Sequence, residues 1–143
     1  MKYSEIKELY SDLEDLGIEN PRYILENLDV DFYSECDNYR IIKDDDIDSI
    51  QCEELGSDLY MLGCFNASFL AMFLSIDADL IQIIQEAGKY EELGKAIIDA
   101  DCLEELQEDY VSADGYGHHF AHYDHNDNEI NINGDLYHVF KVN

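Results

Sequence analysis

Positive charge is scarce in this sequence. Its 143 residues include 8 Lys and Arg against 34 Asp and Glu, which gives a formal net charge of −26. A surface this negative repels phosphate groups, so direct binding to nucleic acid or to an anionic membrane is excluded. A protein partner with a basic surface is favoured instead, although the same composition also occurs in halophilic or merely very soluble proteins.

Paired cysteines and targeting signals are missing as well. The four cysteines form no C-x-x-C pair, so neither a zinc ribbon nor a redox motif is supported: Cys36, Cys52, Cys64 and Cys102. The chain does not begin with a cationic segment followed by an apolar run, so we expect no signal peptide and a reduced, cytoplasmic setting. With one proline and no internal repeat, the sequence predicts a single domain over residues 1–143.

The motifs of the common catalytic classes are absent too. The sequence contains no G-x-S-x-G, no glycine-rich phosphate loop and no H-E-x-x-H. Paired carboxylates occur throughout the chain, so no pair stands out as an acid–base dyad. We therefore expect a protein that is not an enzyme and that carries no cofactor.

What the chain does contain is one long uncharged stretch, residues 59–76. Leu62, Phe65, Phe69 and Phe73 recur in it at helical spacing, and its other faces are largely apolar too. A helix that is apolar all round is buried, so we expect the rest of the chain to wrap this one. Acidic residues flank both of its ends, and no Lys or Arg anchors it, which argues against a membrane span.

The remaining segments predict helices first and strands last. Helical spacing marks 3–16, a short helix from Asn20-Pro21, and the segments 46–55, 78–87 and 90–110. A β-like segment at 39–43 is expected at a sheet edge. After Gly115 the period changes to two, which predicts strands at 116–125, 129–132 and 136–142, with a hairpin turn at Asn133-Gly134. The predicted fold is α+β: a helical body around one buried central helix, followed by a C-terminal three-stranded antiparallel meander.

All five histidines lie in the predicted strands. On a strand, His118 and His122 share one face and His119 and His125 the other, and His122 with Asp124 could begin a metal site. Histidine alternating with aromatic residues is also typical of a half-buried strand surface. We therefore expect no metal ligands here.

The acidic surface is the remaining candidate for function. Four acidic residues on the helix expected near 101–109 form a stripe about 10 Å long, with a charge spacing close to the ~3.4 Å of one DNA strand. Similar stripes are expected on the first helix and at the start of the helix near residue 46. Rows of carboxylates could imitate rows of phosphates, whereas the alternative is that each stripe is only a solvated helix face. The residues expected to bind the partner are Asp12, Asp15, Asp44, Asp45, Asp46, Asp101, Glu104, Glu105 and Glu108.

Two segments carry a resemblance. Leu62-Gly-Cys-Phe-Asn-Ala67 and Asp114-Gly-Tyr-Gly-His-His-Phe-Ala-His-Tyr-Asp124 together resemble small phage-encoded proteins of no assigned activity, over residues 47–143. That resemblance brings no catalytic residue with it. In size and charge the chain is also similar to acidic DNA-mimic inhibitors, namely the Ocr and ArdA antirestriction proteins and some anti-CRISPR proteins. This second likeness is one of composition without a shared motif, so it implies neither their folds nor their targets.

The charge and these resemblances predict a non-enzymatic phage or mobile-element protein that occupies the basic nucleic-acid groove of a host defence complex. The expected partner is a CRISPR effector, a restriction enzyme or another basic nucleic-acid-binding protein. The chain would act in the host cytoplasm as a monomer or homodimer, without binding nucleic acid or membrane directly. An immunity protein or antitoxin against a basic nuclease is the first alternative, because it needs the same charge. A metal-binding protein that uses the His-rich hairpin is the second.

Overall fold

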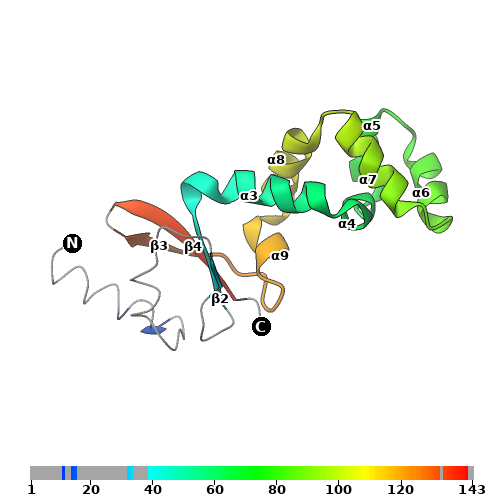
Figure 1. Ribbon diagram of the computed structural model, residues 1–143. Coiled ribbons are helices and arrows are strands. Elements are labelled where there is room, and N and C mark those ends of the chain that lie inside the picture. Colours follow the sequence, from blue (N-terminus) through cyan, green and yellow to red (C-terminus); the bar gives the residue numbers. More distant parts are fainter. Residues whose placement is uncertain (1–10, 12–13, 16–31, 34–38, 133, 142–143) are drawn as a thin grey trace. The chain divides into compact units, whose positions relative to one another are not determined.

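The computed structural model describes residues 11, 14–15, 32–33, 39–132 and 134–141 (Figure 1). Ser11, Glu14 and Asp15 are helical, while the rest of the helices expected at 3–16 and after Asn20-Pro21 lies outside the described residues. The described elements are β1 (Phe32–Tyr33), β2 (Tyr39–Lys43), α3 (Asp44–Ser57), α4 (Leu59–Gly63), α5 (Ala67–Leu74), α6 (Ala78–Glu86), α7 (Tyr90–Asp99), α8 (Leu103–Asp114), α9 (Tyr116–Phe120), β3 (Asn128–Ile132) and β4 (Asp135–Lys141). The predicted α+β class is confirmed.

The chain forms two compact units. Unit 1 comprises residues 1–47 and 113–143, and unit 2 comprises residues 48–112. The boundaries fall inside α3 and α8, so each of these helices contributes residues to both units. That the chain is a single domain stays a prediction.

Unit 1 contains an antiparallel sheet whose described strands have the order β1-β2-β4-β3. Strand β2 pairs with both β1 and β4, so residues 39–43 form the predicted strand but do not lie at an edge. Strands β3 and β4 form the predicted hairpin, with Ile132 opposite Asp135. Gly134 has a φ of 86° in the turn, a conformation that glycine adopts without steric cost.

The strand predicted at 116–125 is wrong, because this segment contains helix α9. Strand β2, rather than this segment, is the third strand beside the β3–β4 hairpin. The buried residues of this segment are Gly117, His119, Phe120 and Ala121, which do not alternate as one face of a strand would. Gly117 is required here because a Cβ would lie 2.1 Å from the backbone oxygen of His125.

The uncharged stretch at 59–76 is two helices, α4 and α5, rather than one. Gly63 ends α4 where the chain packs so closely that a Cβ would lie 1.8 Å from the backbone oxygen of Tyr90. Asn66 then caps α5, since its side-chain oxygen accepts a hydrogen bond of 2.9 Å from the backbone N–H of Ser68. The tertiary contact at Gly63 and the local cap at Asn66 together override the continuous apolar pattern.

Every helix of unit 2 contributes to one hydrophobic core. Its buried members are Leu55, Leu62, Leu70, Ile81, Leu93, Ile97, Cys102, Leu106 and Tyr110. The stretch at 59–76 contributes Leu62 and Leu70 to this core but is not enclosed by the chain, because Cys64 is exposed and Met72 is 68% exposed. The expectation of one fully surrounded central helix is corrected accordingly.

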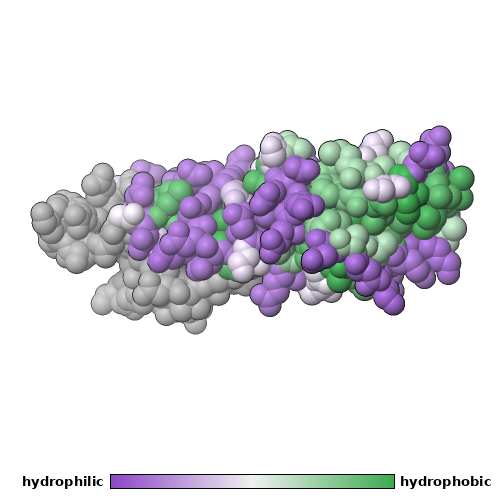
Figure 2. Space-filling view, turned by 90° about the horizontal axis from the view of Figure 1, so that it is seen from above, coloured by the Kyte–Doolittle hydropathy of each residue, from purple (hydrophilic) through white to green (hydrophobic). Residues whose placement is uncertain are grey.

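Hydrophobic side chains gather on the surface of unit 2 over α5 and α6 (Figure 2). Met72, Leu80 and Ile83 are the large exposed ones. No single helix among the described residues is long and apolar enough to cross a membrane. Helices α5 and α6 together reach the length and composition, but the chain bends by 118° between them.

Candidate functional site: an acidic hollow between α3 and α8

The predicted carboxylates of α8 lie on its exposed surface. Glu104, Glu105 and Glu108 are all exposed and share one side of the helix by their spacing. Asp101 precedes the helix in a left-handed backbone conformation, with a φ of 54°. It is exposed but is not part of the helical stripe, which corrects the expectation of a helix that begins at residue 101.

The other predicted carboxylates belong to unit 1. Asp44, Asp45 and Asp46 form the first turn of α3, where negative side chains stabilise the helix N-terminus. All three are exposed, and Asp44 also contacts a buried histidine. Asp15 is exposed and helical, while Asp12 lies outside the described residues.

A hollow of about 320 Å³ lies between the parts of α3 and α8 that belong to unit 2. Asp48, Glu104 and Glu108 contribute carboxylates to it, and its other lining residues are Ser49, Cys52 and Gln107. Neither helix contains a Lys or Arg. The hollow therefore repels anions and is suited to a guanidinium or ammonium group, which carboxylates bind by charge-assisted hydrogen bonds.

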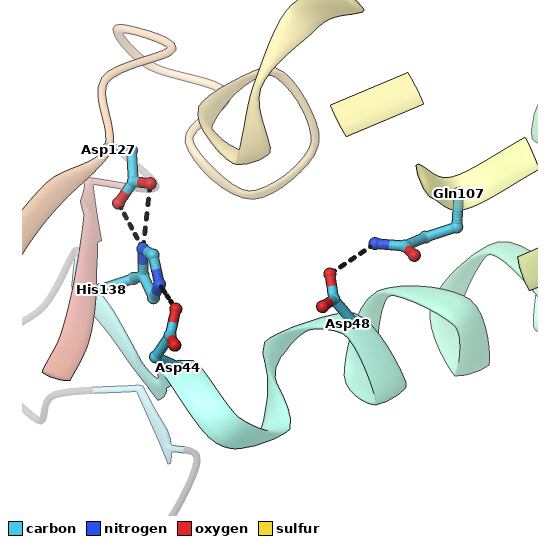
Figure 3. Close-up of polar contacts among 5 residues, drawn as sticks. All are labelled: Asp44, Asp48, Gln107, Asp127 and His138. Atoms are coloured by element: carbon cyan, nitrogen blue, oxygen red, sulfur yellow. Dashed lines mark hydrogen bonds and ion pairs between the residues drawn. The ribbon is translucent and has the colours of Figure 1, made fainter. Parts of the chain in front are cut away.

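A buried glutamine in the lining of the hollow joins the two helices. Gln107 is 2% exposed, and its Nε2 donates one hydrogen bond to Asp48 Oδ1 at 2.9 Å and one to Gln51 Oε1 at 2.8 Å. Figure 3 shows the bond to Asp48. An amide nitrogen has two protons, so both are used. The arrangement holds Asp48 in place beside the carboxylates of α8.

The pKa of the Cys52 thiol is affected by the negative charges of the hollow. Burial raises its pKa, and the carboxylates of Glu104, Asp48 and Glu108 raise it further, because each of them disfavours the thiolate. Negative potential is therefore concentrated at this position. Cys52 is also a free thiol.

The histidines are arranged differently from the prediction. His118 and His119 lie on α9, so the predicted division of the histidines between two strand faces is wrong. The rings of His118 and His125 are 5.1 Å apart, and His119 is buried. His122 is exposed and, with Asp124, is not a member of the convergent group of metal-ligating side chains that the described residues contain.

That convergent group is Asp127, Glu129 and His138, in unit 1. Figure 3 shows Asp127 and His138. His138 is 1% exposed. Its Nδ1 lies 2.8 and 2.9 Å from the two carboxylate oxygens of Asp127, and its Nε2 lies 2.7 Å from Asp44 Oδ1. Burial lowers the pKa of His138, but its hydrogen bonds to Asp127 and Asp44 outweigh that effect, and the pKa is raised.

Sequence reasoning missed this group, although one signal pointed to it. A two-residue turn at Asn133-Gly134 fixes the register of the hairpin and sets Glu129 opposite His138, as the structure has it. Asp127 lies two residues before Glu129 and therefore on the same side of an extended chain. Counting back from the turn would have brought all three together.

Comparison with known proteins identifies no relative: no family model, no curated protein and no solved structure matches the chain.

Proposed function

We propose that this protein is a non-enzymatic inhibitor from a phage or mobile element that blocks the basic nucleic-acid-binding surface of a host defence complex. The complex would be a CRISPR effector or a restriction enzyme in the host cytoplasm. Carboxylates on the protein would take the places of DNA phosphates, so that nucleic acid and inhibitor compete for the same surface.

The acidic hollow between α3 and α8 is the observation that supports this proposal most. Asp48, Glu104 and Glu108 converge on one concave surface whose two helices carry no positive charge. A basic side chain of the partner that entered this hollow would find carboxylates on both helices, as it does between neighbouring phosphates. An isolated acidic helix face offers no such enclosure, so the hollow favours binding over a purely solubilising role.

The spacing along α8 is consistent with mimicry of a phosphate row. Glu104 and Glu108 are four residues apart, which is about 6 Å along a helix, against about 3.4 Å between successive phosphates of one strand. Glu105 lies between them in sequence and outside the hollow lining. A lysine or arginine row that follows a DNA strand would therefore meet one carboxylate at about every second phosphate position.

A displacement experiment tests the proposal. Purified CRISPR effectors and restriction enzymes are loaded with fluorescein-labelled duplex DNA, and the protein is added at low and at high salt while anisotropy is recorded. A target should release its DNA, and the release should weaken as salt is raised because the attraction is electrostatic. Retention on the tagged protein at low salt, with elution by salt, selects which complexes to test.

Two matched variants separate the hollow from overall charge. Glu104→Lys with Glu108→Lys reverses two charges in the hollow and should weaken binding by about 2 kcal/mol or more, about thirtyfold in affinity. Glu91→Lys with Asp99→Lys makes the same change in net charge at exposed positions of α7 and should leave binding within about threefold. Equal loss in both variants, or no DNA displaced from any complex, would refute the proposal. Displacement confined to a free nuclease toxin would favour the antitoxin alternative instead.

A further inference from the structure

The buried histidine of unit 1 lies in an environment with an excess of negative charge. His138 is flanked by Asp127 at Nδ1 and by Asp44 at Nε2, and Glu129 stands directly across the hairpin from it. Three carboxylates therefore surround one imidazole, which can supply at most one positive charge. Two further positive charges, as on a divalent cation, would neutralise this cluster when the imidazole is protonated.

Asp127 turns both of its carboxylate oxygens toward the imidazole. Both of its oxygens lie almost equally close to Nδ1, at 2.8 and 2.9 Å. A single N–H proton at Nδ1 can be shared between these two oxygens, and both oxygens would face an ion that replaced the proton. An ion between them would be bound by the nitrogen and by either or both oxygens.

Glu129 completes a set of three ligand atoms. One atom each from Asp127, Glu129 and His138 lies within 4.8 Å of the other two. Two ligands about 2.0–2.1 Å from a Zn²⁺ ion stand about 3.0–3.4 Å apart. The observed spacing therefore needs shifts of about an ångström or less to bind the ion, and Glu129, which is exposed, is free to make them.

Asp44 and two aromatic rings hold the imidazole in the orientation that such a site needs. With Nε2–H donating to Asp44, Nδ1 faces Asp127, and an ion bound there would replace the Nδ1 proton. A histidine that donates to a carboxylate and binds metal through its other nitrogen is a common metal-site arrangement. The Tyr116 ring meets the imidazole edge-on at 5.2 Å, and the Phe140 ring is stacked at 6.0 Å.

We propose that Asp127, Glu129 and His138 bind one divalent transition-metal ion, for which Zn²⁺ is the probe, and that Asp44 positions His138 as a ligand. Nitrogen and carboxylate oxygen are both ligands of Zn²⁺, and three protein ligands leave its fourth position open. This inference is independent of the proposed inhibitory function, and it departs from the expectation that the chain binds no metal. The site lies on the β3–β4 hairpin, not at the histidines of residues 118–125 that suggested metal binding in the sequence.

The test is a calorimetric titration of the full, untagged chain with Zn²⁺ in a buffer that contains excess Mg²⁺. The Mg²⁺ occupies the diffuse carboxylate surface, so that a specific site stands out as one ion bound per chain. Glu129→Gln keeps the shape of an exposed ligand and should lower the affinity at least tenfold. Asp44→Asn should lower it about 10- to 100-fold, as loss of an outer-shell carboxylate does. Asp109→Asn removes one exposed charge from α8 and should leave the affinity within twofold.

A second readout identifies the ligand atom. Zn²⁺ should shift the ¹⁵N resonance of His138 Nδ1 in the wild-type chain, and circular dichroism establishes that each variant is folded. The proposal is overturned if Glu129→Gln behaves like Asp109→Asn. It is equally overturned if His118→Asn with His125→Asn abolishes the site, or if zinc binds only without saturation and alike in all variants.

Discussion

Replacing Gly94 by alanine should destabilise unit 2, although helix propensity alone favours alanine. Gly94 of α7 lies against the start of α4, where an added Cβ would be 2.1 Å from the backbone oxygen of Leu59. At the other end of the same contact, Gly63 of α4 lies against Tyr90 of α7, with a corresponding distance of 1.8 Å. The two helices therefore run antiparallel with their backbones in direct contact at two glycines.

The magnitude follows from opposing terms. Alanine is favoured over glycine inside a helix by about 1 kcal/mol. A carbon needs about 3.3 Å from an oxygen, so the backbones must separate by about 1 Å, at an overpacking cost of 1–3 kcal/mol or more. Leu62 and Leu93, each next to one of the glycines, are buried and would lose packing contacts in the widened gap. An overpacking cost at the upper end of this range, set against the propensity gain, leaves a net loss of about 2 kcal/mol for Gly94→Ala, and we expect a larger loss for Gly63→Ala.

Urea unfolding followed by circular dichroism at 222 nm measures this loss as a lower midpoint with an unchanged slope. Gly56→Ala is the matched control, because its Cβ would meet only the flexible ends of two side chains, Leu103 at 3.1 Å and Ile98 at 3.9 Å. That variant should lie within about 1 kcal/mol of the wild type in either direction. A Gly94→Ala protein as stable as the Gly56→Ala protein would show that the backbones of α4 and α7 do not meet as described.

Three further outcomes are expected. Gln85→Ala should lower the free energy of unfolding by about 1–3 kcal/mol, measured by thermal unfolding. Gln85 Nε2 donates hydrogen bonds of 3.0 and 2.8 Å to two backbone oxygens at the break between α4 and α5. Gln82→Ala, at an exposed position of α6, should be near neutral. Alkylation of Cys52 by iodoacetamide at pH 8, followed by mass spectrometry, should be about threefold faster in Glu108→Gln. Removing this carboxylate lowers the raised pKa of the thiol and so increases the thiolate fraction. An unchanged rate would contradict the effect of the carboxylates of the hollow on Cys52. In the presence of a chelator, the raised pKa of His138 contributes stability that is complete at pH values below the unfolded-state pKa of about 6.5 and is lost as the pH rises through the folded-state pKa. The unfolding midpoint should therefore fall between pH 6 and pH 9. The His138→Gln variant should show a smaller fall.

Much of the secondary structure could be predicted from local pattern. Apolar spacing, together with Gly and Asp at the ends of the segments, predicted the strand at 39–43 and the helices α6, α7 and α8. The hairpin followed from Asn133-Gly134 because a two-residue turn leaves one register. These features depend on residues within a few positions of one another.

The misassigned segments depend on contacts distant in sequence. The break after Gly63 reflects the approach of Tyr90, and the helical state of residues 116–120 reflects the approach of His125 to Gly117. Neither approach leaves a periodic trace in the sequence. A residue of intermediate hydropathy such as His or Tyr fits either period, so tertiary packing decides.

The candidate sites divide in the same way. Glu104 and Glu108 were predicted from their position on one helix, but the pairing of that helix with Asp48 was not, because Gln107 joins α3 and α8 across more than fifty residues. The group at His138 likewise needs Asp44, which is 94 residues away in sequence. Sequence patterns thus identify which residues share an element, whereas the partner of that element is decided by the fold.

The pairing of β2 with β4 has a consequence for synthesis of the chain on the ribosome. Tyr39 pairs with Lys141, so β2 is translated about a hundred residues before its partner. Unit 2 is one continuous segment and can bury its core as soon as it has left the ribosome. Ile41 and Ile42 are buried in the folded protein but cannot pair with β4 until β4 has been synthesised. During that interval the strand offers an open hydrogen-bonding edge and apolar side chains to other nascent chains or to chaperones. The high negative charge that surrounds it, including Asp44, Asp45 and Asp46 directly after the strand, keeps such strands apart by mutual repulsion until β4 arrives.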